Sequence, residues 1–387
     1  MKRSGNAVSR SGAPLALLLA GALGACGTSS TAGPARPGAS PTTAASPAAS
    51  PSAAAATGCP GSFTPPQATT AASYPTALAF APDGRLFYAE RAGTIRVFQG
   101  GQALAFASLP TVTTETGGGY SERGLLGLAI SPHFAQDHYV YAFYSETNRS
   151  TQQVVRFTDD CQGHGTAEAT IVAGLPAGSD CCHKGGRLAF GPEGDLYVTL
   201  GETHSAAAAQ DKCDPRGKVL RYTAAGQPAP GNLCGPVYAY GLRNPFGMAF
   251  SPDGQLFVTS NGPSGDAGSP GTGYDTADLV RAGANYQWPA CYGYSHPIGG
   301  SACPAGSVGP DYSSEAATIV PTGAAWATSG PYAGHFVFCS YAHSTLKVFI
   351  GARQVQDGPQ GCALDVKQGP DGALYFSDTG SIYRFAG

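Results

Sequence analysis

The stretch His183-Lys-Gly-Gly-Arg-Leu-Ala-Phe places an imidazole directly after two adjacent cysteines, Cys181 and Cys182. An imidazole with a pKa of about 6.5 suits proton removal around neutral pH, so His183 is a candidate general base. The alternative is a structural histidine that donates a hydrogen bond to a loop. A second stretch, Leu-Arg-Asn-Pro-Phe, contains Arg243 and Asn244. A fixed guanidinium can stabilise charge that develops on an oxygen, although an arginine can also serve hydrogen bonds between structural units.

These candidate residues lie among copies of a recurring motif. Each copy reads as an apolar strand, a Pro-Asp-Gly or Pro-Glu-Gly turn, and a second apolar strand. The copies begin at Leu78, Leu188, Met248 and Val366, with a looser copy at Leu128. Proline sets φ and glycine supplies a positive φ, which is the chemistry of a turn between paired strands. We therefore expect a β-hairpin at each copy.

The spacing of the copies predicts the architecture. They start roughly 40 to 60 residues apart, a period typical of propeller blades. A longer gap after Met248 contains a degenerate unit from Gly323 to Phe349, with Phe336-Val-Phe as its best strand. The six units predict an all-β fold: a six-bladed β-propeller of four-stranded antiparallel blades with essentially no long helices. The 55 glycines and 31 prolines suit many short strands joined by turns.

Four stretches, in this order, resemble the glucose/sorbosone dehydrogenase family over about residues 60 to 387. They begin at Glu122 (Glu-Arg-Gly-Leu-Leu-Gly), His183, Gly241 and Asn285 (Asn-Tyr-Gln-Trp-Pro). The family consists of soluble quinoproteins that oxidise aldoses with pyrroloquinoline quinone (PQQ). The resemblance implies that His183 is the general base and that Arg243 and Asn244 lie beside the reactive carbonyls of the quinone.

The resemblance also implies a calcium ion, held against the quinone by the backbone carbonyls of a Gly-Pro pair, here Gly262 and Pro263. Calcium is a hard cation that prefers oxygen ligands. Acidic residues follow the pair in the family. Here Asp266 follows at once, while Asp275 and Asp278 come only after a glycine-rich insertion. This spacing leaves open which carboxylate supports the metal, and aspartates are also common in glycine-rich loops for turn reasons.

The chain departs from the family's pattern near its C-terminus. Many PQQ-binding relatives have an Arg-x-Arg-Asp-Val stretch and a separate lysine, which face the carboxylates of the quinone. The matching positions here read Cys362-Ala-Leu-Asp-Val and Ser340-Tyr-Ala-His, so all three cations are missing. His343 and Lys347 are the candidates to compensate. The sorbosone-dehydrogenase-like branch of the family also tends to lack the arginines.

The resemblance therefore predicts that a sugar or related polyol is oxidised by hydride transfer to PQQ, with the electrons passing to an unidentified acceptor. The missing cations favour an alternative, a binding protein that kept the propeller and lost the cofactor. A third reading is a calcium-dependent, lactonase-type hydrolase on the same architecture, which needs a metal ringed by side-chain oxygens. With 12% charged residues and a net charge of −3, the chain lacks the basic surface that nucleic-acid binding needs.

The first 26 residues are typical of a lipoprotein signal peptide. A basic start precedes an apolar run, too short to span a bilayer, that ends in Leu-Gly-Ala-Cys; Cys26 matches the lipidated cysteine of a bacterial lipobox. The alternative is an ordinary signal peptide cut near Ala25. Residues 27–57 are almost wholly Ser, Ala, Pro, Thr and Gly, which predicts a disordered tether. We expect the folded body, residues 58–387, at the extracytoplasmic face of the cell membrane, held there only by the lipid.

The chain has 11 cysteines, and ten remain when Cys26 is set aside. This even number predicts paired thiols in an oxidising compartment. Five disulfides are possible, and spacing does not fix their connectivity. Buried free thiols are the alternative to full pairing. A bridge between the neighbours Cys181 and Cys182 would force a strained eight-membered ring, so we expect each to pair with a distant cysteine.

Cys26→Ala should release the protein from the membrane fraction, because the tether has no other means of staying there. Fractionation and immunoblotting of cells that express the wild type or the variant measure this. A variant that stays in the membrane fraction would show that something other than a lipid on Cys26 anchors the chain.

Overall fold

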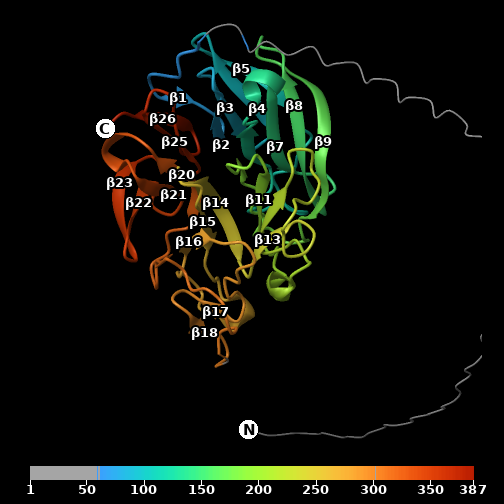
Figure 1. The fold of residues 1–387 in the computed structure, drawn as a ribbon, viewed down its shortest axis with the longest axis vertical. Helices are drawn as coiled ribbons and strands as arrows, with labels where there is room; N and C mark the ends of the chain where they lie inside the picture. Colours follow the sequence, from blue (N-terminus) through green and yellow to red (C-terminus); the bar gives the residue numbers. More distant parts are fainter. Residues whose placement is uncertain (1–58, 60–61, 301) are drawn as a thin grey trace, which may run out of the picture. The chain divides into compact units, whose positions relative to one another are not determined.

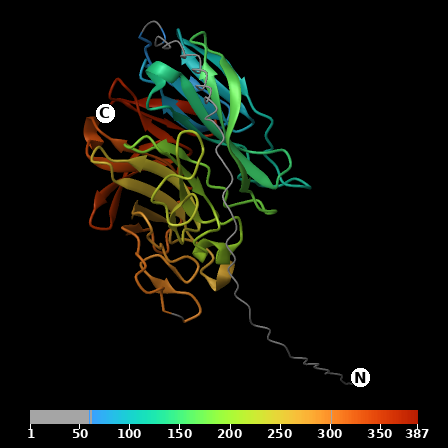
Figure 2. The same cartoon turned by 45° about the vertical axis from the view of Figure 1, so that its right-hand side comes forward.

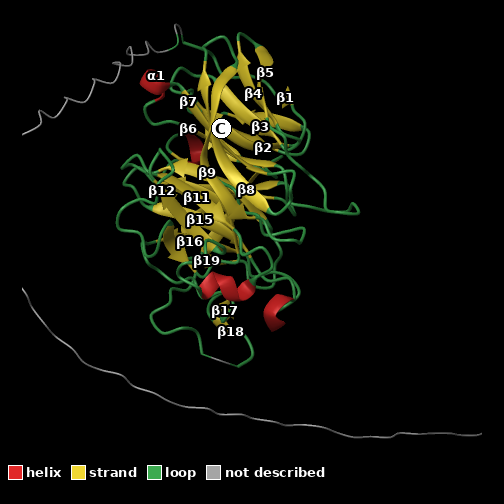
Figure 3. Ribbon diagram, turned by 90° about the vertical axis from the view of Figure 1, so that its right-hand side faces the viewer, coloured by secondary structure: helices red, strands yellow, loops and turns green. Residues whose placement is uncertain are grey.

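The computed structural model describes residue 59, residues 62–300 and residues 302–387. The predicted signal peptide with Cys26 and the predicted tether lie outside these residues. The described part is almost entirely β-structure (Figure 3). Its helices are α1 (Phe134–Asp137) and three short 3₁₀ helices, η1 (Ala206–Gln210), η2 (Asp266–Gly268) and η3 (Gly330–Tyr332). In the described part, no helix has both the length and the apolar character that a membrane span requires.

Six four-stranded antiparallel sheets surround a central channel, as Figure 1 and Figure 2 show. The first blade contains β2 (Pro75–Phe80), β3 (Leu86–Glu90), β4 (Thr94–Gln99) and β5 (Gln102–Ser108). The second contains β6 (Leu125–Ile130), β7 (Tyr139–Ser145), β8 (Thr151–Asp159) and β9 (Gly165–Pro176). The third contains β10 (Leu188–Phe190), β11 (Leu196–Leu200), β12 (Lys218–Tyr222) and β13 (Val237–Tyr240).

The fourth blade carries the largest insertion. It contains β14 (Asn244–Phe250), β15 (Leu256–Asn261), β16 (Thr276–Val280) and β19 (Tyr312–Ser313). A small hairpin of β17 (Cys291–Tyr292) and β18 (His296–Pro297) lies between β16 and β19, drawn in orange at the lower end of Figure 1. The fifth blade contains β20 (Pro321–Ala327), β21 (His335–Ser340), β22 (Thr345–Gly351) and β23 (Gln354–Gln360), which is the degenerate unit expected from the sequence.

The sixth blade closes the ring by joining the two ends of the described body. Three of its strands come from the C-terminal end: β24 (Val366–Gln368), β25 (Leu374–Ser377) and β26 (Ser381–Phe385). Its outermost strand is β1 (Thr70–Ala71), where Thr70 pairs with Ile382. The predicted six-bladed, four-stranded β-propeller is confirmed, and the closure leaves no blade incomplete.

The turn glycines of the repeated motif have the predicted conformation. Gly84, Gly194, Gly254 and Gly372 have φ values of +95°, +87°, +82° and +80°. At Gly84 a Cβ atom would also lie 2.2 Å from the carbonyl oxygen of Phe63. A residue with a side chain would meet both a backbone penalty and a clash there. The recurring sequence therefore does form the hairpin turns between the first two strands of four blades.

Apolar side chains between neighbouring blades form the core. The strands nearest the channel are buried on both faces, as in β2 and β3, whereas the outermost strand β23 is mostly exposed. Aromatic rings cross the blade boundaries: Tyr141 lies 5.1 Å from Phe190, and Phe257 lies 5.3 Å from Phe336, centre to centre. Such close-packed contacts fix the inner strands, and with them the loops at the ends of the channel.

All ten cysteines of the described part form disulfides, which confirms the predicted pairing. The five bridges are Cys59–Cys161, Cys181–Cys182, Cys213–Cys234, Cys291–Cys303 and Cys339–Cys362. The expectation that Cys181 and Cys182 find distant partners is wrong, because they are bonded to each other. They lie in the loop between β9 and β10, where no strand geometry holds the backbone, and the other eight cysteines are already paired.

Removing the Cys59–Cys161 bridge should cost more stability than removing the Cys181–Cys182 bridge, because a disulfide that closes a longer loop restricts the unfolded chain more. The cysteines of the first bridge are 102 residues apart and those of the second are adjacent. The chain-entropy model gives losses of about 4.7 and about 1 kcal/mol in the free energy of unfolding. Denaturant unfolding of the two double cysteine-to-alanine variants measures the difference, and a reversed order would contradict the loop argument.

Candidate active site

The predicted site residues come together at one face of the ring of blades. His183 and Arg243 precede β10 and β14, Asn244 is the first residue of β14, and Gly262 and Pro263 follow β15. In an antiparallel blade the start of the first strand lies beside the end of the second strand. The topology therefore gathers at the same end of the channel residues that are far apart in the sequence.

An open cavity of about 740 Å³ lies at this face, and we call it the His183 cavity. Its lining includes Cys182, His183, His204, Arg243, Asn244, Gly262, Pro263 and Asp275. A second cavity of about 540 Å³, the channel cavity, is lined by residues that include Tyr74, Arg91, Leu126, Arg187, Phe246, Tyr341 and Leu364. Both share Tyr120, Glu122, Asn261 and Val320, so the two cavities are neighbours.

His183 is buried and uncharged. Its Nδ1 is hydrogen bonded to Oε1 of Glu202, and its ring stacks on His204 with the ring centres 4.1 Å apart. Burial and then the positive charge of Arg243 lower the pKa of His183 to about 3. When Nδ1–H donates to Glu202, Nε2 carries the lone pair and faces no hydrogen-bond partner among the described residues. A neutral imidazole of this kind can accept a proton from a bound molecule.

The loop before β10 holds His183 in an unusual backbone conformation. His183 has a φ of +58°, in the left-handed region that costs a residue with a side chain about 1 to 3 kcal/mol. A Cβ atom at Gly186 would lie 2.8 Å from the ring of Phe143 and 2.9 Å from Leu126. The second glycine of the His-x-Gly-Gly-Arg motif therefore lets the loop lie directly against the second blade. Close packing keeps the imidazole in place.

Glu202 is the site residue that sequence reasoning missed. It follows β11 and is fully buried, and burial raises its pKa to about 7. Its Oε2 has no hydrogen-bond partner within the described residues. A signal was available: Glu202 comes two residues after the second strand of the blade whose first strand follows His183. Paired antiparallel strands put those two positions at the same corner.

Arg243 is held by the loop that follows β15. Its Nε lies 2.8 Å from Oδ2 of Asp266, and its Nη2 lies 3.1 Å from Oδ1 of the same carboxylate and 3.2 Å from Oγ of Ser264. Nη1 donates to the carbonyl of Gly262. His183, Glu202 and Asp266 present oxygen or nitrogen atoms that all lie within 4.8 Å of one another. The guanidinium therefore sits fixed beside the imidazole, with its charge balanced by Asp266.

The Asn-Tyr-Gln-Trp-Pro motif contacts Arg243 and the backbone just before it. The N–H of Trp288 donates to the carbonyl of Gly241 at 2.9 Å, and the N–H of Tyr286 donates to the carbonyl of Tyr240 at 2.8 Å. The guanidinium of Arg243 lies 5.5 Å from the centre of the Trp288 ring, within range of a cation–π contact. The motif thus positions the arginine and does not itself line the His183 cavity.

The three aspartates after Gly262 contact different groups of the protein. Asp266 pairs with Arg243. Asp275 accepts hydrogen bonds from the backbone N–H groups of Gly262, Ile319 and Val320 at 2.8, 2.8 and 2.9 Å. Asp278 is buried beside Thr276, and burial raises its pKa to about 7. The structure therefore uses all three carboxylates to hold protein groups.

The donor set around Gly262 fits a hard cation through neutral oxygens. Asn261 precedes the Gly-Pro pair, and its Oδ1 is buried without a hydrogen-bond partner in the described part of the chain. The carbonyl of Gly262 accepts from Arg243 and retains a second lone pair. Calcium binds amide and carbonyl oxygens of this kind. Asn261, Gly262 and Pro263 would hold such an ion.

His343 and Lys347 lie apart from these groups. Neither is among the residues that line the two cavities. Lys347, in β22, forms an ion pair with Asp357 in β23, at the outer edge of its blade. His343 lies in the turn between β21 and β22, where its N–H donates to Oγ of Ser340 at 3.2 Å.

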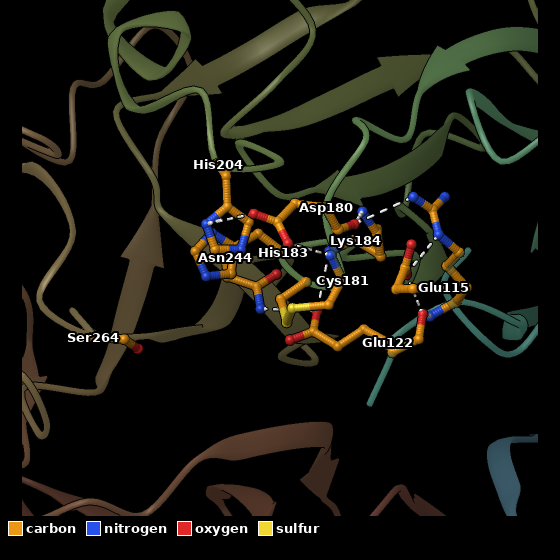
Figure 4. The surroundings of a disulfide bond; sticks show 12 residues. Glu115, Glu122, Asp180, Cys181, His183, Lys184, His204, Asn244 and Ser264 are labelled. Carbon is orange, nitrogen blue, oxygen red and sulfur yellow. Dashed lines mark hydrogen bonds and ion pairs between the residues drawn. A yellow bond between two sulfur atoms is a disulfide. The ribbon is translucent and has the colours of Figure 1, made fainter. Parts of the chain in front are cut away.

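The Cys181–Cys182 disulfide lies in the wall of the His183 cavity. Figure 4 shows Glu122, His183, His204 and Asn244 gathered around it. The carbonyl of Cys181 accepts from the N–H of Glu122 at 2.9 Å, and the Nδ2 of Asn244 lies 3.3 Å from Oε2 of Glu122. The hydrogen bond from Glu122 to Cys181 therefore joins the loop that carries His183 to the segment that enters the second blade.

The chain is similar to a known protein family and to several known proteins. The family model described as glucose/sorbosone dehydrogenase matches residues 72–384. An aldose sugar dehydrogenase of Escherichia coli is 31% identical over 232 residues, which are 56% of this chain. The matched segment spans 59% of that relative.

Two solved structures resemble the whole described body. A putative oxidoreductase (glucose dehydrogenase) from Thermus thermophilus is 32% identical with a TM-score of 0.68, covering 82% of this chain and 99% of that one. The PQQ-bound form of an aldose sugar dehydrogenase from Streptomyces coelicolor is 28% identical with a TM-score of 0.66, covering 82% of this chain and 95% of that one.

We expect the His183 ring to stay neutral when the pH is lowered from about 8 to about 5, because burial and the charge of Arg243 oppose its protonation. The ¹⁵N chemical shifts of histidine-labelled protein report ring protonation, and His183→Gln identifies the signal. A His183 signal that becomes protonated within this range would contradict the described surroundings of the ring.

Proposed function

The chain belongs to the glucose/sorbosone dehydrogenase family, and we propose that it oxidises a sugar or a related polyol by hydride transfer to PQQ. The observation that carries the proposal is the buried, neutral imidazole of His183, held through Nδ1 by Glu202 and lining an open cavity. The relatives described above, one of them solved in a PQQ-bound form, support the same reaction class.

His183 would remove the proton from the sugar hydroxyl through Nε2. Loss of that proton makes the carbon–hydrogen bond a better hydride donor, so removal of the proton and departure of the hydride assist each other. Glu202 would hold the ring in the tautomer that leaves Nε2 free, and its carboxylate would stabilise the imidazolium that forms. This is the orienting role of an acidic group behind a catalytic histidine.

Arg243 would stabilise negative charge on an oxygen in the His183 cavity. Its guanidinium is fixed by Asp266 and by the Asn285-Tyr-Gln-Trp-Pro motif, so little reorganisation is needed when charge develops. The same charge keeps His183 neutral before the reaction. Asn244 adds a buried Oδ1 that has no hydrogen-bond partner in the described part of the chain and is therefore open to a ligand.

PQQ, when bound, supplies the acceptor of the hydride and later passes the electrons to an acceptor of unknown identity. Asn261, Gly262 and Pro263 would hold the calcium ion beside it, as their neutral oxygens permit. The sugar would then enter from the open side of the His183 cavity.

We propose that the enzyme works at the extracytoplasmic face of the membrane, held by a lipid on Cys26 and without a nucleic-acid partner. Five disulfides in the described body support an oxidising compartment. The substrate at this location would be a small sugar from outside the cytoplasm.

Reconstitution tests the proposal directly. Purified protein is incubated with PQQ and Ca²⁺, excess cofactor is removed, and reduction of an artificial dye is followed with a panel of aldoses and polyols. We expect sugar-dependent reduction only when PQQ has been added. Failure to retain PQQ at micromolar concentration would support the cofactor-free binding protein instead, and lactone hydrolysis that requires Ca²⁺ alone would support the hydrolase.

His183→Ala should leave PQQ binding nearly intact while kcat falls by roughly 10² to 10⁴, the usual range for loss of a general base. Arg243→Ala should weaken both PQQ retention and turnover, because its charge acts in the ground state as well as in the transition state. Cofactor titration and steady-state kinetics on the two variants separate these effects. A His183→Ala enzyme that oxidises sugars at the wild-type rate would remove His183 from the mechanism.

A further inference from the structure

Two arginines face the channel cavity without a carboxylate partner. All the hydrogen bonds that the side chains of Arg91 and Arg187 make within the described part of the chain go to backbone carbonyls. Other arginines of this region behave differently: Arg123 pairs with Glu115, and Arg243 pairs with Asp266. Two guanidinium groups that form no hydrogen bond to a carboxylate in the described part of the chain therefore line one cavity.

Arg187 lies at the floor of the channel cavity. Its guanidinium donates to the carbonyls of Thr76, Leu126 and Leu364, which belong to three different blades, and it lies 4.8 Å from the centre of the Phe246 ring. Only 4% of Arg187 is exposed, and its Nε has no hydrogen-bond partner in the described residues. A buried cation whose partners are all neutral is costly, and a nearby anion would offset that cost.

Arg91 lies in the wall of the same cavity. Its Nε donates to the carbonyl of Arg123 at 2.9 Å, and its Nη2 donates to the carbonyls of Thr113 and Ser121. Its guanidinium lies 5.1 Å from the centre of the Tyr74 ring. The remaining terminal nitrogen, Nη1, makes no hydrogen bond within the described chain, so it can donate to a ligand.

The rest of the lining suits a flat, aromatic anion. Leu126, Phe246, Val320 and Leu364 supply apolar surface, and burial raises the pKa of Tyr74 to about 12, which keeps its hydroxyl a neutral donor. Glu122 is the one carboxylate among the residues that line this cavity. Its Oε2 accepts from the backbone N–H of Lys184 at 3.1 Å and so is engaged on the side of the His183 cavity.

We propose that the channel cavity binds the carboxylate groups of the quinone cofactor through Arg91 and Arg187, which replace the basic residues missing near the C-terminus. This inference rests on the proposed function. Cys362 and Leu364 stand where many PQQ-binding relatives have the two arginines of the Arg-x-Arg-Asp-Val stretch, and Leu364 lines this same cavity. The positive charge has thus moved from the last two blades to Arg91 in the first and Arg187 at the start of the third.

The test compares PQQ with its trimethyl ester, in which three methyl groups remove the carboxylate charges. Quenching of the intrinsic fluorescence measures the binding of each ligand to the purified protein. The measurement is made with Ca²⁺ present, at low and at high salt. We expect the wild type to bind PQQ more tightly than the ester, and to lose that preference as salt screens the charges. Equal binding of both ligands at low salt would overturn the inference.

Arg91→Met should weaken PQQ binding by at least about tenfold and leave ester binding nearly unchanged, because the variant removes charge and keeps the apolar stem. Arg91→Lys, which retains the charge, should recover most of the affinity for PQQ. Melting temperatures of both variants show whether the loss of backbone hydrogen bonds has disturbed the fold. A wild type that binds PQQ and an Arg91→Met variant that binds it equally well would overturn this inference and leave the proposed function standing.

A second pair of variants does not touch either arginine. Leu364→Glu places a carboxylate beside Arg187, and we expect it to weaken PQQ binding; Leu364→Gln, of the same size but uncharged, should weaken it much less. Equal effects of the two substitutions would contradict a role for charge on this wall. If the wild type binds neither PQQ nor the ester, the proposed function fails first, and the inference fails with it.

Discussion

The arrangement of the site depends on the hydrogen bonds that the buried guanidinium of Arg187 makes to several blades. Its guanidinium binds carbonyls from the first, second and sixth blades and lies against Phe246 of the fourth. Because Arg187 starts the third blade, one buried charge joins five of the six blades at the channel. His183 lies four residues earlier on the same loop. The geometry that centres the ring therefore also sets the position of the imidazole.

Around that fixed point, buried charges are balanced locally. Asp266 neutralises Arg243, and Glu202 holds Nδ1 of His183. Burial lowers the pKa of His183, so the imidazole is neutral in the resting protein, and burial raises the pKa of Glu202 to about 7. A base that is neutral, oriented and beside a fixed cation is what removal of a proton from a hydroxyl requires. The channel cavity differs, because within the described residues neither Arg91 nor Arg187 forms a hydrogen bond to a carboxylate.

The repeats allowed much of the fold to be predicted, because turn chemistry is local. A glycine at positive φ after Pro-Asp marks a hairpin whatever surrounds it, as at Gly84 and Gly254. The motifs also placed His183, Arg243 and Gly262 in one cavity. Side-chain contacts between neighbouring strands of one blade could not be read from the motifs. Glu202 belongs to the site through strand pairing, while Lys347 is drawn to the outer edge of its blade by Asp357.

The hydrogen-bond partners of the aspartates and the pairing of Cys181 and Cys182 also depend on tertiary structure, so they could not be predicted from the sequence. Asp275 is a candidate metal ligand in the sequence, and the structure adds that its carboxylate accepts hydrogen bonds from three backbone N–H groups. Cys181 and Cys182 are bonded to each other in a loop, where the cost of the small ring could not be weighed from sequence alone. The sequence motifs do not single out Asn261. Only the structure shows that its Oδ1 is buried without a hydrogen-bond partner in the described part of the chain.

The most direct test of the central claim is an anaerobic single-turnover experiment. Protein loaded with PQQ and Ca²⁺ is mixed with a sugar in the absence of any electron acceptor, and the absorbance of the quinone is recorded. The account predicts that the spectrum of oxidised PQQ is replaced by that of the reduced cofactor within one turnover, with one equivalent of oxidised sugar formed. A spectrum that stays oxidised with every aldose and polyol tried would contradict it.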